Sequence, residues 1–140
     1  MKVWNFKGKN QVLIRTHEYL IDWKKDGASK LETRFKELIF PFWGGQIVLE
    51  QLRIPGSLLR IDFLNCTKRL AVEINGPQHD EFNPHFHRGS PVNFRASIRR
   101  DMKKILWCEA NNIQVLELIE EDLGYFSPKY IQEKFNVDII

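Results

Sequence analysis

Cysteines and long hydrophobic runs are both scarce in this sequence. Its two cysteines, Cys66 and Cys108, lie in different predicted elements and lack the spacing of a metal site. We therefore expect free thiols in an intracellular, reducing compartment. No hydrophobic run approaches the roughly 18 residues of a membrane span. The opening residues, Met-Lys-Val-Trp-Asn-Phe-Lys, contain no apolar segment typical of a secretory signal. These absences predict a cytoplasmic protein with no membrane partner.

The composition is that of a folded globular protein. The 140 residues include 43% hydrophobic and 12% aromatic side chains, which is enough for a sizeable buried core. The net charge is only +3, which by itself is weak evidence for a nucleic-acid partner. The position of the basic residues along the chain is therefore more informative than their number.

Hydrophobic periodicity and turn residues predict an α/β fold with a mixed central β-sheet flanked by α-helices. Ser29 and Glu32 form a capping-box pattern that begins the first helix, and Pro41 and Gly44-Gly45 are expected to end it. The remaining predicted elements are a strand over 47–54, two strands within 58–79, a helix over about 93–111, a strand over 114–119 and a helix over about 128–135.

The order of these elements constrains the topology and the domain division. The strands before and after the 93–111 helix are expected to pair in parallel through a crossover connection. Residues 120–127 are expected to form a short acidic turn. We assign residues 1–28 to an N-terminal arm or small lobe, and residues 29–140 to the α/β domain.

Asp62 and Glu73 each stand within an apolar strand, where an unpaired carboxylate is costly. A turn of two or four residues at Cys66-Thr67 would place Asp62 opposite Ala71. Glu73 would then be its diagonal neighbour on the same face, about 7–8 Å away at the backbone. Two such carboxylates could hold Mg²⁺ or Mn²⁺, which prefer oxygen ligands. The other face is expected to point into the core through Ile61, Phe63, Leu70, Val72 and Ile74.

Each acid also has a simpler interpretation. Asp62 and Glu73 could form structural ion pairs with nearby bases, namely Arg60, Lys68 or Arg69. Glu32 is fully explained by the capping box. Asp101 could pair with Lys104 on the surface of its helix. The spacing alone leaves the metal site and the ion pairs both open.

The predicted helix over 93–111 carries five basic side chains in two adjacent rows. One row contains Arg95, Arg99 and Lys103, and the other contains Arg100 and Lys104. Little acid lies between them, which favours a surface that contacts phosphates over a merely solvated face. Its apolar positions step by three and four and are expected to face the core: Phe94, Ile98, Met102 and Ile105.

Three histidines follow the second acidic strand. His79, His85 and His87 could form a zinc site, although no cysteine is near and the loop is rich in turn residues. His79 alone could act as a general acid or base, because it directly follows the strand that carries Glu73.

Several of these strings together resemble a known superfamily. They are Arg-Ile-Asp-Phe at 60–63, Leu-Ala-Val-Glu-Ile-Asn-Gly-Pro-Gln-His at 70–79, Arg-Asp-x-x-Lys at 100–104 and Ile-Gln-Val-Leu-Glu-Leu at 113–118. The pattern is similar to the PD-(D/E)xK nucleases, which have a restriction-endonuclease-like core. Within them it is most similar to the Vsr-like and EDxHD endonucleases and related small phage and bacterial proteins. The resemblance covers residues 29 to 120.

The resemblance implies roles for individual residues. Asp62 and Glu73 match the family's two metal-ligating acids, with the main-chain carbonyl of Ile74 as a third ligand. Catalytic roles are implied for Glu32, on the preceding helix, for His79 and for Asp101, early in the following helix. In one departure, Asn75 stands where the family has a lysine. Gln78, His79 or a lysine of the basic helix would have to substitute for it.

The sequence therefore predicts a Mg²⁺- or Mn²⁺-dependent endonuclease that hydrolyses DNA, and it leaves open whether RNA is also a substrate. Its five basic helix residues would contact the nucleic-acid backbone. A chain of this size has little room for a separate reader domain. Low sequence specificity, structure-selective cutting, or dependence on a homodimer or partner protein is thus expected, and the resemblance suggests a phage-encoded protein acting in a host cell. The alternative is a catalytically inactive nucleic-acid-binding module that retains the nuclease fold.

Overall fold

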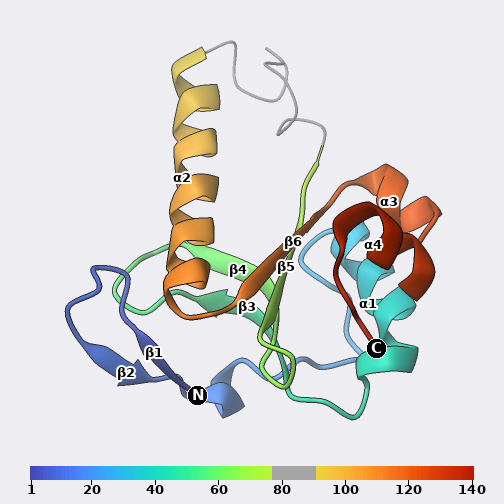
Figure 1. The fold of residues 1–140 in the computed structure, drawn as a ribbon, viewed down its shortest axis with the longest axis horizontal. Helices are drawn as coiled ribbons and strands as arrows, with labels where there is room; N and C mark the ends of the chain where they lie inside the picture. Colours follow the sequence, from blue (N-terminus) through green and yellow to red (C-terminus); the bar gives the residue numbers. More distant parts are fainter. Residues whose placement is uncertain (77–90) are drawn as a thin grey trace.

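A four-stranded mixed sheet forms the centre of the fold in a computed structural model that describes residues 1–76 and 91–140, with side chains omitted for 91–98 (Figure 1). The strand order is β3-β4-β5-β6, formed by Val48–Arg53, Arg60–Asn65, Leu70–Ile74 and Gln114–Leu118. Neighbouring strands are antiparallel except β5 and β6, which are parallel and joined through α2 (Pro91–Ala110). The α/β class, the mixed sheet and the parallel pair are as predicted.

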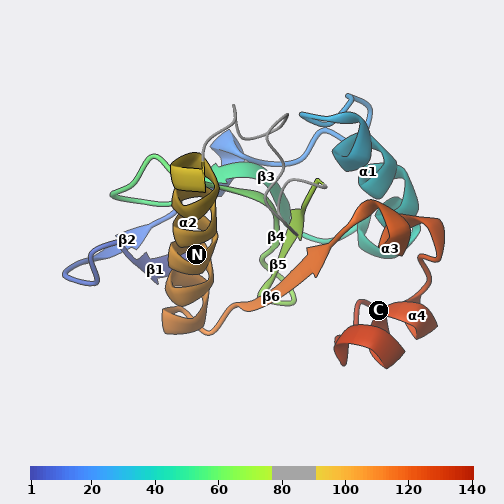
Figure 2. The ribbon, with the colours of Figure 1, turned by 90° about the horizontal axis from the view of Figure 1, so that it is seen from above.

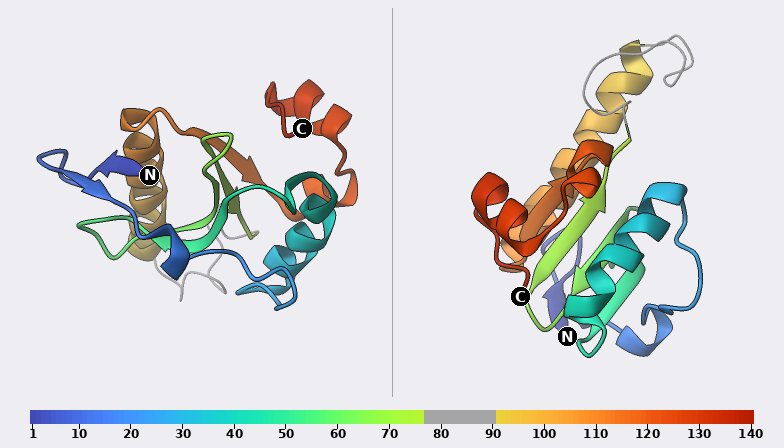
Figure 3. Two further views of the ribbon diagram at one scale, coloured as in Figure 1. Left: turned by 90° about the horizontal axis from the view of Figure 1, so that it is seen from below. Right: turned by 90° about the vertical axis from the view of Figure 1, so that its right-hand side faces the viewer.

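Helices lie on both sides of this sheet (Figures 2 and 3). One face packs against α1 (Lys30–Trp43), α3 (Glu120–Gly124) and α4 (Pro128–Phe135), through a core that includes Phe35, Phe63 and Leu116. The other packs against α2 and a hairpin of β1 (Lys2–Trp4) and β2 (Gln11–Leu13), through a core that includes Leu64 and Trp107. The sheet is therefore buried on both faces, as expected for an α/β protein.

Helix α1 begins as predicted and ends at Gly44, the second of the two predicted stops. The Ser29 side chain accepts a hydrogen bond from the Glu32 N–H at 3.1 Å, which caps the first turn. Pro41 does not end the helix, which continues to Trp43. A proline this close to the C-terminal end costs one intrahelical bond, and the Gly44 N–H still reaches the Phe40 carbonyl at 2.9 Å.

Residues 1–28 contain the β1–β2 hairpin and a short 3₁₀ helix, Thr16–Glu18. Val3 and Ile14 are buried in the core under α2. Further along, the Glu50 N–H donates to the Tyr19 carbonyl at 2.8 Å, and the Ile21 N–H donates to the Val48 carbonyl at 3.0 Å. These bonds cover part of the edge of β3, so the segment is joined to the sheet by both backbone and side chains.

The helices after the sheet depart from the sequence pattern in two places. Met102 was expected to face the core but is 57% exposed, because α2 turns Trp107 and Cys108 inward instead. The acidic segment after β6, predicted as a turn, forms the short helix α3, whereas α4 has the predicted bounds. Cys66 and Cys108 are both free thiols, as expected. Among the described residues, no helix has the length and apolar character needed to cross a membrane.

Candidate active site

Asp62 and Glu73 lie opposite each other where the pairing of β4 and β5 ends. The pairs run from Asn65–Leu70 to Phe63–Val72, so the next position in register joins the two acids. The predicted pairing of Asp62 with Ala71 was wrong by two residues: that pairing corresponds to a turn of two residues, 66–67, whereas the connecting turn contains four, 66–69. A shift of two leaves the side-chain parity unchanged and brings the acids closer than the predicted diagonal.

Side chains replace the backbone ladder at this pair. The Asp62 N–H donates to Oε2 of Glu73 at 3.2 Å, and the Ile74 N–H donates to Oδ2 of Asp62 at 2.9 Å. Each carboxylate thus accepts a hydrogen bond from the backbone of the opposite strand. Such charge-assisted bonds offset part of the cost of burying an acid in an apolar strand.

Strand β3 is irregular at the same level. Its pairs with β4 run from Val48–Asn65 to Arg53–Arg60 but omit Gln51 and Asp62. Gln51 has a φ of 53°, in the left-handed region that residues other than glycine rarely adopt. Its side chain reaches α1, where Nε2 donates to Oε1 of Glu32 at 2.6 Å. Backbone strain of this kind is typical of functional sites.

Side-chain alternation changes phase at this irregularity on both strands. Leu49 and Leu52 pack in the same core although regular alternation would separate them. On β4, Ile61 packs in the core under α2 and lines a small cavity with Glu73. The prediction that Ile61 points away from the acids, on the face of Phe63, was therefore wrong. Asp62 stands at the phase change, between the α1 and α2 layers.

Glu32 brings a third carboxylate from α1. Its Oε2 accepts from the Ser29 hydroxyl at 2.9 Å, and its Oε1 accepts from Gln51, so the side chain turns toward the sheet. Burial raises the pKa of Glu32 to about 7, and the charge of Asp62 adds to the rise. The Ser29 cap is confirmed, but the Glu32 carboxylate accepts from the Ser29 hydroxyl and from Gln51 rather than completing a capping box. Glu32 is therefore a first-turn residue of α1 whose side chain belongs to the acid cluster.

Glu73 is the most perturbed acid of the cluster. Only 9% of the residue is exposed. Burial, followed by the charge of Asp62, raises the pKa of Glu73 to about 8. Lys104 of α2 opposes this rise, since its Nζ lies 3.0 Å from Oε1 of Glu73. Burial would lower the pKa of Lys104, but the Glu73 charge raises it above the ordinary value. The lysine is therefore held in its charged form beside the acid.

Asn75 and Asp101 are neighbours of the Glu73–Lys104 ion pair. Both line the small cavity that also contains Glu73 and Lys104. The position where the resembling family has a lysine is thus occupied by Asn75, while α2 supplies Lys104 from the other side of the cavity. Within the described ranges, Lys104 is therefore the residue at the acids that could substitute for the absent lysine. Gln78 and His79 lie outside the described residues.

A second ion pair extends the cluster toward the edge of the sheet. Lys36 of α1 is 3% exposed, and its Nζ lies 3.1 Å from Oε1 of Glu50. The same ammonium donates to the carbonyls of Asp22 and Lys25, at 2.9 and 2.8 Å. Oε2 of Glu50 is buried without a hydrogen-bond partner in the described part of the chain.

Sequence reasoning overlooked Lys36, Glu50 and Gln51. A signal for Glu50 was present, because it follows Val48-Leu49 in an apolar strand, as Asp62 follows Ile61. Lys36 stands one helical turn after Glu32, on the same side of α1. Nothing in the sequence indicates the left-handed conformation of Gln51.

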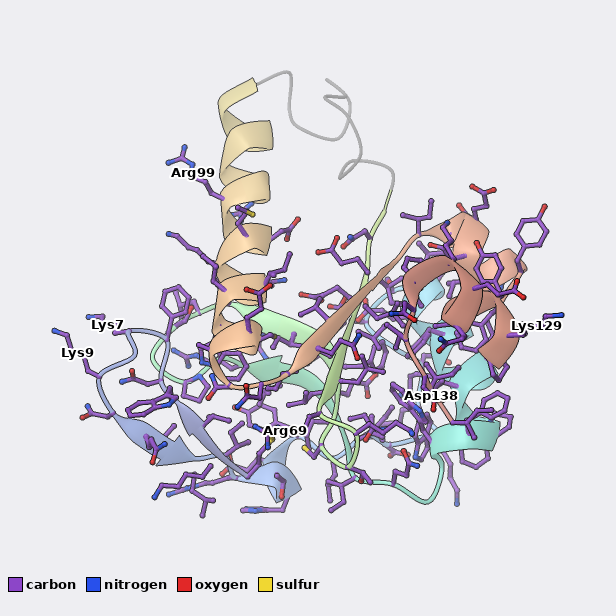
Figure 4. All side chains as sticks on the ribbon, viewed as in Figure 1. Lys7, Lys9, Arg69, Arg99, Lys129 and Asp138 are labelled. Atoms are coloured by element: carbon purple, nitrogen blue, oxygen red, sulfur yellow. The ribbon has the colours of Figure 1, made fainter. Side chains whose placement is uncertain are left out.

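The four basic residues of α2 whose side chains the structure describes lie in different environments. Lys104 faces Glu73, whereas Arg99, Arg100 and Lys103 are exposed. Arg99 projects from the side of the molecule on which Lys7 and Lys9 lie (Figure 4). The Arg95 side chain lies outside the described residues, as do the remaining members of the zinc hypothesis, His85 and His87.

The ion pairs considered for Asp62 and Glu73 are replaced by other contacts, whereas Asp101 does lie near Lys104, because its charge helps to raise the pKa of that lysine. Arg60 donates to the Gln51 carbonyl, Lys68 to the Ile140 carbonyl, and Arg69 to the carbonyls of Asn111 and Asn112. The two acids therefore face each other and Lys104. In the described ranges, no group of three or more His, Cys, Asp or Glu side chains is close enough to hold a metal ion as the side chains stand.

The fold and the site together define a mixed α/β protein with a cluster of carboxylates between two helical layers. No family model matches the chain, and no solved structure matches it. Two curated relatives do match, both named as uncharacterized proteins. Protein 033L of Invertebrate iridescent virus 3 is 34% identical over 88 residues, covering 63% of this chain and 43% of the relative. Protein 307L of Invertebrate iridescent virus 6 is 40% identical over 60 residues, covering 43% of this chain and 30% of the relative.

The chain thus spans less than half the length of these curated relatives.

Proposed function

We propose that this protein is a divalent-metal-dependent endonuclease that hydrolyses DNA, built on a restriction-endonuclease-like core. One observation carries the proposal: Asp62 and Glu73 oppose each other where β4 and β5 separate, with the Lys104 ammonium 3.0 Å from Glu73. Glu73 keeps a raised pKa beside the Asp62 carboxylate, which is expensive for folding alone. Perturbed groups of this kind are concentrated at functional sites.

The donor set fits a hard divalent cation. Carboxylate and carbonyl oxygens are the ligands that Mg²⁺ and Mn²⁺ prefer. Asp62, Glu73 and the main-chain carbonyl of Ile74 would hold the ion. Glu32 lies near this site, because the charge of Asp62 contributes to its raised pKa. A bound ion would lower the pKa of a water and offset charge on the phosphate.

The chain's own residues would supply the rest of the chemistry. Lys104 would hold the Glu73 carboxylate in place and stabilise negative charge that develops on the phosphate. Glu32, with a pKa of about 7, would accept a proton from the attacking water at neutral pH. Asp101 lines the cavity beside Lys104 and would position it. The exposed Arg99, Arg100 and Lys103 would contact the DNA backbone.

A second function has a specific observation in its favour. Asp62 and Glu73 accept backbone N–H bonds from each other's strands, so both acids are partly satisfied without a ligand. A non-catalytic nucleic-acid-binding module that retains this fold would keep such an arrangement. It predicts no response to divalent ions, either in stability or in DNA cleavage.

Plasmid nicking with Mg²⁺ or Mn²⁺ separates these functions. We expect Asp62→Asn and Glu73→Gln, which preserve side-chain shape, to lower the nicking rate at least about 100-fold, because removing one charge-stabilising group typically costs that much. Lys104→Met should lower it by a similar factor. The matched control is Glu133→Gln, since Glu133 lies in an exposed ion pair on α4 with its side chain 68% exposed.

Metal binding provides an independent readout. Mn²⁺ should raise the melting temperature of the wild type and of Glu133→Gln, and chelation should reverse the change, because an ion bound only by the folded state stabilises it. Asp62→Asn should not respond. Equal nicking by wild type, Asp62→Asn and Glu73→Gln would exclude the active-site assignment. No nicking and no Mn²⁺ response in the wild type would favour the binding module.

A further inference from the structure

A groove separate from the acid cluster lies between the β1–β2 hairpin and α2. Its volume is about 430 Å³, and its walls include Trp4 and Phe6 from the hairpin side and Leu106 and Trp107 from the helix. Trp4 is 41% exposed and Leu106 is 59% exposed, while Trp107 is buried and forms the base. The groove thus exposes one indole, that of Trp4, beside the aliphatic side chain of Leu106.

Hydrogen bonds between the hairpin and α2 involve the backbone of Trp4 and not its ring. The Trp107 Nε1–H donates to the Trp4 carbonyl at 2.8 Å, and the Trp4 N–H donates to Oδ1 of Asn111 at 2.7 Å. The Asn111 side chain in turn donates to the Trp107 carbonyl at 3.0 Å. Only the backbone of Trp4 takes part in these hydrogen bonds, so they do not require the indole.

The charge around the groove is of one sign. The first fourteen residues contain three lysines and no acid. Lys103 lines the groove, and none of the residues that line it is acidic. Lys7, Lys9 and Lys103 are exposed, as is Arg99 one turn before Lys103 on α2. In Figure 4, Lys7, Lys9 and Arg99 project from the same side of the molecule.

We propose that this hairpin groove binds an unpaired segment of a nucleic-acid strand. Aromatic surface combined with positive charge is the chemistry that recognises single strands, because bases stack on the rings while phosphates contact the cations. The Trp4 ring, beside Leu106, would stack on a base, and Lys7, Lys9 and Lys103 would contact the flanking phosphates.

Helix α2 connects this groove to the acid cluster. Lys103 and Lys104 are consecutive and point about 100° apart around the helix. The first lines the groove and the second meets Glu73. This proposal rests on the proposed function in taking nucleic acid as the substrate. It deepens that function by assigning a substrate class, DNA with a single-stranded region next to the bond that is cut.

The test is equilibrium binding of a fluorescein-labelled oligothymidylate by the full chain, measured by anisotropy in EDTA so that no cleavage occurs. We expect Trp4→Ala to weaken binding at least about fivefold, since stacking contributes substantially per base. Trp4→Phe should restore most of the affinity. Lys103→Ala should reduce the salt slope of log K by about 0.7, the value for one phosphate contact to a single strand.

Matched controls lie at the opposite end of the molecule. Tyr125 is 65% exposed near α3, and the Lys129 side chain is 85% exposed on α4, far from Lys7 and Lys9 in Figure 4. Tyr125→Ala and Lys129→Ala should bind the oligonucleotide as the wild type does. The melting temperature of each variant confirms that it is folded.

Three results would overturn the proposal. Wild-type affinity in Trp4→Ala would show that the ring does not contact the strand. If Trp4→Ala lost as much affinity for a blunt duplex as for oligothymidylate, the groove would not recognise an unpaired base. A wild-type dimer that Trp4→Ala converts to a monomer, measured by sedimentation, would make a second copy of the chain the occupant.

Failure of this proposal and failure of the nuclease proposal are distinguishable. If nicking requires Asp62 but oligonucleotide binding is unchanged in Trp4→Ala, only the groove proposal is excluded. Binding that depends on Trp4, in a protein that nicks nothing, supports the groove and removes the nuclease.

Discussion

Asp122 and Glu73 are both buried carboxylates with a lysine partner, but they differ in their hydrogen bonds and in the direction of their pKa shifts. Asp122 is 2% exposed and accepts from the Ile119 N–H at 2.9 Å, the Tyr130 hydroxyl at 2.7 Å and the Lys134 ammonium at 2.6 Å. Burial would raise the pKa of Asp122, but these hydrogen bonds, led by that of Ile119, lower it below the ordinary value.

Glu73 is similarly buried, yet it faces another acid, and its pKa rises to about 8. Asp122 has donors on every side, while Glu73 has one backbone donor and one ammonium. The comparison shows that burial alone does not decide whether an acid is structural. The completeness of its hydrogen bonds does, and the incompletely satisfied acid is the better candidate for binding a ligand.

Neutralising the two acids should therefore affect stability differently, and this is the largest effect we expect. Asp122→Asn should lower the free energy of unfolding by about 2 kcal/mol at pH 7, because it disrupts charge-assisted bonds at a buried position. Glu73→Gln should change it by less than about 1 kcal/mol, since the lost Lys104 pair is offset by relief of repulsion from Asp62. Urea unfolding of both variants measures the difference. Equal losses would mean that Glu73 is a structural acid like Asp122.

The same contrast should appear in the pH dependence of stability. Glu73 and Glu32 have ordinary pKa values of 4.5, raised by folding to about 8 and about 7. Between these values the folded protein binds protons that the unfolded chain has released. The free energy of unfolding should therefore fall as pH rises from 5 to 8, by at least about 2 kcal/mol.

Asp122 acts in the opposite sense, because its pKa is lowered by folding from 3.8. Its contribution is present above that ordinary value and is lost as pH falls through the lower folded value. Stability should thus be greatest near pH 5. Unfolding curves at a series of pH values check this. Glu73→Gln should reduce the fall in the free energy of unfolding between pH 5 and 8. An unchanged fall in that variant would contradict the raised pKa of Glu73.

The sequence predicted the parts of this site that depend on local pattern. The Ser29 cap, the bounds of α4 and the pairing of β5 with β6 follow from capping, proline placement and a crossover. Asp62 and Glu73 were placed on neighbouring strands, but their register was not, because turns of two and four residues both fit the polar segment after Asn65.

The remaining features depend on tertiary packing. Five basic residues on α2 look alike in sequence, and only the position of the helix against β5 selects Lys104 for Glu73. Met102 fits an apolar stripe but is exposed, because the inward face is set by Trp107 and Cys108. The inward turn of Glu32 depends on Gln51, a residue on another element, whose conformation has no sequence signal.

Gln51 allows the smallest and most local test of the comparison. A site that binds a ligand tolerates backbone strain, whereas the structural site around Asp122 has no need of it. At a φ of 53°, alanine is strained and glycine is not. Both substitutions remove the hydrogen bond to Glu32, so the difference between them isolates the backbone.

We expect Gln51→Gly to be more stable than Gln51→Ala by about 1 kcal/mol, measured by urea unfolding. The control pair is at Gln114, an exposed position in the regular strand β6, where alanine should be the more stable of the two. The same order at both positions would mean that Gln51 is not strained. A preference for glycine at Gln51 alone would show that the fold accepts a cost in β3 to direct an amide at Glu32, next to the two acids of β4 and β5.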